Sequence, residues 1–173
     1  EVEEDDVVWP ADPQTRTRHR PSAPAAAVRE IASLLRSAEQ PVIVSGGGVL
    51  WSEAERELET FVNATGIPFY TTPQARGVIP EDHDYCYLSA RSTAFREADV
   101  IIVLGTRLNY VIGHADAPRF NRDAKLVRID IDPEEIATSG RLDVGVVADA
   151  KIVLTQLIEA LGDTVTPETY RTW

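Results

Sequence analysis

The chain has 173 residues, which suits one domain with a substantial core and is short for two. It is 43% hydrophobic and 26% charged, and its formal net charge of -11 repels nucleic acid and anionic membranes, so neither is an expected partner. Cys86 is the only cysteine, which excludes an internal disulfide and a zinc site built from several cysteines. Because no leader pattern or long apolar run is visible, we expect a protein of the cytoplasm.

The first segment, residues 1–23, differs from the rest of the chain in composition. It joins an acidic run to two prolines and to the basic run TRTRHR at positions 15–20. Little core can form from such residues, so we expect a linker or arm, and the basic run fits a solvated linker better than a phosphate site. One folded domain is predicted over residues 24–162, followed by a second linker over residues 163–173.

Strands and helices alternate along the predicted domain. Apolar residues at helical spacing predict helices, and unbroken β-branched runs predict strands that are buried on both faces. The predicted helices cover residues 25–38, 53–64, 89–97, 133–137 and 151–161. The predicted strands cover residues 41–45, 67–72, 99–105, 125–131 and 144–147. This alternation predicts an α/β fold with a three-layer, doubly wound, mostly parallel sheet of the Rossmann-like type.

Two stretches lie where such sheets bind ligands, beyond the carboxyl ends of the strands. The strand at 41–45 runs into the glycines Gly46–Gly48 before a helical pattern, and free backbone N–H groups at such a turn form an anion site. The strand LVRIDID ends in Asp130 and Asp132, whose carboxylates can accept hydrogen bonds from a ribose or a base. Together these stretches predict a nucleotide-binding domain.

A dinucleotide-dependent dehydrogenase is the obvious alternative. Its fingerprint needs a third glycine where this chain has Trp51. It also needs an acidic residue at the end of the next strand, where this chain has Thr71 and Thr72. Both requirements fail, and the Walker lysine pattern is absent too.

Catalytic or metal-binding sets are hard to assemble from this sequence. The histidines His19, His83 and His114 are far apart in the chain. His114 and Asp116 could form an acid–base or metal pair, but a surface pair in a loop is the favoured interpretation. Cys86 lies between two tyrosines and is more typical of a packed thiol than of a nucleophile. We therefore predict no catalytic and no metal-binding residue in this chain.

Arg91 opens a short predicted helix just before a central strand. A guanidinium there can bind a phosphate bidentately, but a surface salt bridge is about as probable from spacing alone. Asp132 and Asp149 leave the same choice open, because each directly precedes a predicted helix and can serve as its N-cap.

Six motifs occur in one order along residues 24–161. They are PVIVSGGGV, PFYTTPQARGVIPEDH, ARS at 90–92, ADVIIVLGTRLN, KLVRIDIDPEEI and VVADAK. Each is weak alone, but in this order the set resembles the central domain of thiamine diphosphate-dependent enzymes. That group includes acetolactate synthase, 2-hydroxyacyl-CoA lyase and oxalyl-CoA decarboxylase.

The resemblance implies a DHS-like NAD/FAD-binding type of domain, which often holds ADP or FAD. By resemblance, the residues that would contact such a nucleotide are Gly46, Gly47, Gly48, Arg91, Asp130, Ile131, Ala148 and Asp149. The glycines and the arginine would face the pyrophosphate, and the others the ribose and adenine. The RLN sequence at 107–109 resembles the 2-hydroxyacyl-CoA lyase and oxalyl-CoA decarboxylase branch, where ADP or nothing replaces FAD.

The resemblance also implies that catalysis belongs to other domains of a parent enzyme. That parent would use thiamine diphosphate and Mg²⁺ on 2-keto or 2-hydroxyacyl substrates, as a homodimer or homotetramer. Its metal motif, glycine-aspartate-glycine, is not matched by residues 162–164, and both ends of this chain, residues 1–8 and the TYRTW sequence at 169–173, resemble connections to neighbouring domains. We therefore expect a non-catalytic, nucleotide-binding and structural domain that is inactive alone.

Two other interpretations stay open at this point. One is a purely structural middle domain whose nucleotide site is empty. The other is a self-standing enzyme on the related NAD-dependent deacylase fold, which needs a catalytic histidine and usually a zinc site of four cysteines. The sequence does not decide between ADP, FAD, CoA and an empty site, nor does it give the parent's substrate.

Overall fold

The computed structural model describes residues 19–173. Its α-helices are α1 (Ala25–Ser37), α2 (Gly48–Trp51), α3 (Glu55–Thr65), α4 (Arg91–Glu97), α5 (Pro133–Ala137) and α6 (Ala150–Leu161). Its strands are β1 (Pro41–Ser45), β2 (Phe69–Thr71), β3 (Val100–Leu104), β4 (Lys125–Asp130) and β5 (Val144–Val147). Short 3-10 helices are η3 (Pro73–Ala75), η4 (Leu88–Ala90), η5 (Tyr110–Ala115), η6 (Gly162–Thr164) and η7 (Pro167–Tyr170). Every predicted strand and helix is present, and α2 is an additional short helix that begins at the last of the three glycines, Gly48.

The strands form one parallel sheet in the order β2-β1-β3-β4-β5. β1 pairs with β3 over its whole length, from Pro41 opposite Val100 to Ser45 opposite Leu104. The predicted α/β fold with a doubly wound, Rossmann-like parallel sheet is confirmed. Because β2 and β3 lie on opposite sides of β1, the strand order reverses between β1 and β3. In open sheets of this kind the ligand site lies at such a reversal.

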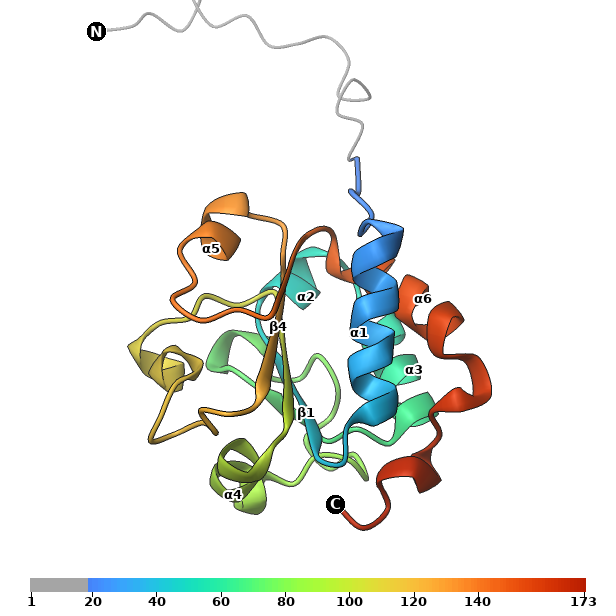
Figure 1. Ribbon diagram of the computed structural model, residues 1–173, viewed down its shortest axis with the longest axis vertical. Coiled ribbons are helices and arrows are strands. Elements are labelled where there is room, and N and C mark those ends of the chain that lie inside the picture. The colour runs from blue at the N-terminus through green and yellow to red at the C-terminus, as the bar shows by residue number, and fades with distance from the viewer. Residues whose placement is uncertain (1–18) are drawn as a thin grey trace, which may run out of the picture.

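Helices α1, α3 and α6 cover one face of the sheet (Figure 1). Their side chains Leu35, Leu58 and Leu157 are fully buried and join Ile43 and Val127 of the strands in the larger apolar core. Full burial of each such side chain contributes about 1.5–3 kcal/mol, so this face supplies most of the hydrophobic stabilisation.

The opposite face is covered more thinly, by α4 and by the segment from residue 106 to 124. Phe95 of α4 stacks on Phe120 with ring centroids 4.4 Å apart and meets the edge of Tyr70 at 5.1 Å. These three rings are buried and form the centre of a second, smaller apolar cluster. This side of the sheet depends on loops as much as on helices.

Local sequence signals explain where the helices end and begin. Gly66 adopts a left-handed conformation with φ 71° and its N–H donates to Val62 O, so this glycine terminates α3. The Asp132 carboxylate accepts a hydrogen bond from the N–H of Glu134 and caps α5. The N-cap interpretation of Asp132 is thereby confirmed.

The described part of the arm, residues 19–23, contacts the domain. Ala23 is buried, and the backbone N–H of Asp149 donates to Pro21 O at 2.9 Å. The predictions for residues 1–18, including the acidic run and most of the basic run, lie outside the described residues.

The tail after α6 also packs on the domain instead of leaving it. Val165 and Tyr170 are buried, and the Trp173 Nε1–H donates to Pro41 O at 3.0 Å. Burial raises the pKa of Tyr170 to about 12, with a smaller contribution from Asp99. The tail shows no periodicity because its apolar side chains reach the core one at a time, from η7 and from the irregular residues on either side of it.

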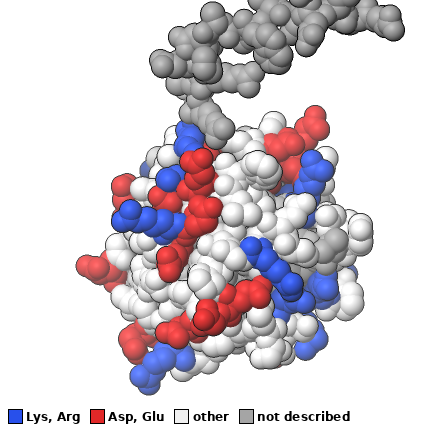
Figure 2. Space-filling view, turned by 180° about the vertical axis from the view of Figure 1, so that it is seen from behind, with Lys and Arg blue, Asp and Glu red and all other residues white. Residues whose placement is uncertain are grey.

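The described surface carries charges of both signs. In Figure 2 acidic side chains form bands beside smaller basic groups, around a broad uncharged area. No helix within residues 19–173 is both long enough and apolar enough to cross a membrane.

Candidate functional site

A cavity of about 770 Å³ lies beyond the carboxyl ends of the strands, where the strand order reverses. Figure 1 shows α2 and α5 at this end of the sheet. The wall of this cavity is built by the segments that follow all five strands, including Gly47, Gly48, Ser52, Thr72, Gln74, Thr106, Arg107, Asp130, Ile131, Glu135, Ala148 and Asp149. All five strands therefore contribute to one concave site at the carboxyl edge of the sheet.

The glycines allow two loops to approach each other at the floor of this site. A Cβ atom on Gly48 would lie 2.6 Å from Gly105 Cα, and one on Gly46 would lie 2.2 Å from Thr106 Cβ. The N–H groups of Gly46 and Gly48 donate to Leu104 O and Gly105 O at 2.8 Å. The expectation that this turn leaves its N–H groups free is therefore wrong for these two glycines, because the neighbouring loop already accepts their hydrogen bonds.

The end of β4 brings carboxylates to the opposite wall. Asp130 Oδ1 accepts a hydrogen bond from the N–H of Asp132 at 3.0 Å, which shapes the turn into α5. Ile131 lies between them with 55% of its surface exposed and lines the cavity. This wall combines hydrogen-bond acceptors with one apolar side chain.

Asp149 is occupied by structural contacts. Its carboxylate accepts hydrogen bonds from the N–H groups of Lys151 and Ile152, so it caps α6, as one of the two interpretations predicted. It also accepts from the Ser52 hydroxyl at 2.8 Å and pairs with Arg20 of the arm at 3.0 Å. Asp149 thus connects the arm, α2 and α6 at the cavity wall.

Three charged residues that were not among the predicted nucleotide contacts form a chain beside the cavity. Arg107 Nε lies 3.2 Å from one oxygen of Glu135, whose other oxygen lies 3.2 Å from Nη2 of Arg128. Arg128 is fully buried within β4. A lone arginine inside the apolar run KLVRIDI was a usable signal, because a buried arginine needs partners.

The structure brings most of the predicted nucleotide contacts together. Those that line the cavity are Gly47, Gly48, Asp130, Ile131, Ala148 and Asp149. Gly46 lies directly beneath it, against Thr106.

Arg91 is not brought to the cavity. It is exposed at the start of α4, which Figure 1 shows toward the other end of the sheet from α2 and α5. Its charge is felt instead at Tyr70: burial, with Cys86 and Tyr87 adding, raises the pKa of that phenol to about 12, and Arg91 opposes the rise. Arg107, which follows β3, is the only Lys or Arg side chain among the described residues that line the cavity.

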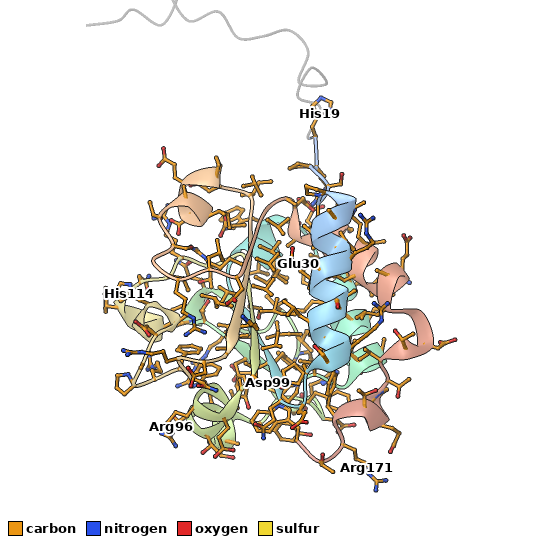
Figure 3. The ribbon with its side chains drawn as sticks, in the orientation of Figure 1. His19, Glu30, Arg96, Asp99, His114 and Arg171 are labelled. Atoms are coloured by element: carbon orange, nitrogen blue, oxygen red, sulfur yellow. The ribbon has the colours of Figure 1, made fainter. Side chains whose placement is uncertain are left out.

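The histidines and the cysteine are not assembled into a reactive group. Figure 3 places His19 on the arm and His114 across the molecule from α1, while His83 accepts a hydrogen bond from the N–H of Tyr85 at 3.2 Å. Burial, followed by the charge of Glu81, raises the pKa of the Cys86 thiol, which disfavours the nucleophilic thiolate. Within residues 19–173 no cluster of His, Cys, Asp and Glu could hold a metal ion.

Residues 28–157 match the family described as "Thiamine pyrophosphate enzyme, central domain". The chain belongs to this family. The resemblance seen in its six motifs is confirmed.

Relatives of this thiamine pyrophosphate enzyme domain include complete enzymes of two kinds. The chain is 39% identical over 136 residues to 2-hydroxyacyl-CoA lyase of Arabidopsis thaliana, covering 79% of this chain and 24% of that protein. It is 39% identical over 142 residues to acetolactate synthase of Mycobacterium bovis, covering 78% and 23%. The crystal structure of benzoylformate decarboxylase from Polynucleobacter necessarius superposes with a TM-score of 0.68 at 18% identity, covering 92% of this chain and 32% of that chain, which supports the fold. The domain spans about a quarter of the length of these curated relatives.

Proposed function

We propose that this central domain binds an adenine nucleotide, ADP or FAD, without taking part in the chemistry of its parent enzyme. The parent forms or cleaves a carbon–carbon bond of a 2-keto or 2-hydroxyacyl substrate. Thiamine diphosphate and Mg²⁺ are held by its other domains, and the cofactor serves there as an electron sink. We place the parent in the cytoplasm, as a homodimer or homotetramer.

The cavity at the strand reversal carries this proposal. Its volume of about 770 Å³ lies within the range of roughly 300–1,000 Å³ that is typical of small-molecule sites. Its position is the one at which open parallel sheets bind nucleotides. Polar groups from several loops converge on this space, among them Asp130 and Arg107.

The cavity wall also has the chemistry that a nucleotide needs at each end. The two Nη atoms of Arg107 make no hydrogen bond with the described residues, so they are free to bind a pyrophosphate. Asp130 offers a carboxylate to ribose hydroxyls, and Ile131 offers apolar surface to a base. The RLN sequence at 107–109 favours ADP over FAD.

Calorimetric titration with ADP and, separately, with FAD tests the proposal. We expect micromolar ADP binding, which Arg107→Ala weakens by about 1.5–3 kcal/mol because a charged hydrogen bond is lost. Arg91→Ala is the matched control, and we expect it to leave the affinity unchanged, because Arg91 does not line the cavity. An Arg91→Ala variant that loses ADP while Arg107→Ala retains it would restore the assignment made by resemblance.

A purely structural domain with an empty site is the second candidate. It is favoured by the N–H groups of Gly46 and Gly48, which are already bonded, and by Asp149, whose carboxylate is taken by Arg20 and by the α6 cap. If neither ADP nor FAD binds to the domain or to the full-length parent, this candidate replaces the first.

A further inference from the structure

One carboxylate at the cavity wall is shared between an exposed and a buried arginine. Glu135, on α5, places one oxygen 3.2 Å from Arg107 Nε and the other 3.2 Å from Arg128 Nη2. The side chain of Arg107 is 77% exposed, that of Glu135 21% and that of Arg128 2%. A line of alternating charge therefore runs from the cavity into the interior of the sheet.

The buried end of this line is fixed. Arg128 also donates to the backbone carbonyl of Glu135, to the Ser139 hydroxyl and, at 3.3 Å, to Thr106 O. Because Arg128 holds both the backbone and the carboxylate of Glu135, α5 cannot move away without leaving a buried charge unpaired. Glu135 is thus anchored from behind.

The exposed end is held weakly. Arg107 pairs with Glu135 through Nε, and an ion pair with so exposed a partner contributes little to stability because water competes for both charges. A bound anion can therefore draw Arg107 away while Glu135 stays with Arg128. The two ion pairs differ in strength because Arg128 is desolvated, whereas Arg107 remains in contact with water.

We propose that Glu135 is a specificity-determining residue of this cavity: it is an internal counter-ion for Arg107, and a ligand must displace it. A carboxylate ligand only matches what Glu135 already supplies, whereas a phosphate dianion carries more charge and three acceptor oxygens. Glu135 therefore selects phosphate-bearing nucleotides over carboxylate-bearing ligands of similar shape. This inference rests on the proposed nucleotide function and names Glu135 as the residue that determines which anions the cavity binds.

The test compares Glu135→Gln with the matched control Glu134→Gln. Glu134 is the preceding residue of α5, carries the same charge and is exposed. Calorimetry with ADP and adenosine at low salt should show ADP binding about three- to fivefold more tightly to Glu135→Gln, because an exposed ion pair no longer has to be broken. Adenosine, which has no phosphate, should bind equally to all three proteins, and Glu134→Gln should match the wild type for ADP.

The variant Arg107→Ala separates displacement from general repulsion. In this background the gain from Glu135→Gln should disappear, because there is no guanidinium left to release. Should the gain persist, or appear equally in Glu134→Gln, the effect is bulk charge and the inference is overturned. An unchanged or weaker ADP affinity in Glu135→Gln overturns it as well.

Glu135→Gln leaves Arg128 without its counter-ion, so folding is checked by circular dichroism. If the variant is unfolded, Glu135→Asp replaces it: the shorter carboxylate stays near Arg128 but no longer spans both guanidinium groups, and the same gain is expected at smaller size. Inorganic pyrophosphate is titrated in parallel. Pyrophosphate binding that strengthens in Glu135→Gln, without ADP or FAD binding, supports the anion selection and rejects the nucleotide function. If neither the wild type nor Glu135→Gln binds ADP, FAD or pyrophosphate, both the anion selection and the nucleotide function are rejected.

Discussion

The two faces of β4 differ in chemistry: one is apolar throughout, and the other combines the buried Leu126 with the buried Arg128. Val127 and Ile129 point into the apolar core beneath α1, α3 and α6, and both are fully buried. One residue along, Arg128 points to the other face and is equally buried, but it is held by oxygen acceptors and by Glu135. Apolar burial stabilises the first face through area alone, whereas the second depends on every partner being present. The first face supports the fold, and the second sets the position of the cavity wall.

The largest expected effect is at the polar face. Arg128→Ala should lower the free energy of unfolding by about 3–5 kcal/mol, because Glu135 and the carbonyl of Thr106 lose their donor in a buried place. Urea denaturation followed by circular dichroism measures it. Replacing both partners, as Arg128→Met with Glu135→Leu, should recover most of the loss. If the free energy of unfolding of Arg128→Ala lies within about 1 kcal/mol of the wild-type value, the Arg128 side of β4 does not depend on its polar partners as inferred.

A matched change on the apolar face should cost somewhat less and leave the cavity intact. Leu58 of α3 is fully buried, so Leu58→Ala should lower the free energy of unfolding by about 2–4 kcal/mol through lost burial and a residual cavity. Ligand affinity should not change, because Leu58 lies in the core beneath the sheet. A parallel loss of ADP affinity in calorimetry would mean that the two faces are not independent.

A smaller loss of stability is expected at the ion pair between Arg20 of the arm and Asp149 of the cavity wall. Arg20→Ala removes the ion pair with Asp149 and the hydrogen bond to the Ser52 carbonyl, and we expect a loss of about 1–2 kcal/mol, discounted because Arg20 is partly exposed. Asp149 keeps its capping bonds to α6, so thermal unfolding should stay cooperative. Faster hydrogen exchange should be confined to the arm and α2.

The smallest expected effect depends on pH. Burial acts to raise the pKa of Asp143, but hydrogen bonds from the Lys125 ammonium and the Leu126 N–H outweigh it and hold the pKa below its ordinary value of 3.8. A lowered pKa in the folded state means that this stabilisation is present above about pH 4 and is lost as the pH falls through the folded value.

Asp143→Asn should therefore cost about 0.5–1 kcal/mol at pH 7, as expected for a partly exposed ion pair. The difference from the wild type should shrink below pH 4, which urea titrations at pH 7 and pH 3 measure. A difference that is the same at both pH values would show that the carboxylate charge is not the cause.

The sheet could be predicted because its signals are local. The runs PVIVS and DVIIVL are apolar on both faces, and only a parallel strand covered on both sides accommodates that. The caps at Gly66 and Asp132 were equally readable, because each acts on the backbone within a few residues. The tail was not, since Tyr170 and Trp173 reach Leu35 and Pro41 from more than 130 positions away.

The candidate site was predictable only in part, for the same reason. Glycines after β1 and carboxylates after β4 meet at one edge because parallel strands end together, and this follows from order alone. Arg91 and Arg107 both flank β3, and spacing does not say which of them faces the cavity. The bonded N–H groups of Gly46 and Gly48 depend on the loop after β3, which lies nearly 60 residues further along the chain.

By itself the sequence determined the family, the parallel sheet and the edge at which a ligand would bind, because these follow from periodicity and from motifs in order. Only the tertiary structure decided which charged groups are free. In the folded protein Asp149 pairs with Arg20, and Glu135 pairs with both Arg107 and Arg128. Arg91 lies outside the cavity. A hydrogen bond or ion pair needs atoms within about 4 Å, and residues distant in sequence reach that separation only when the chain has folded.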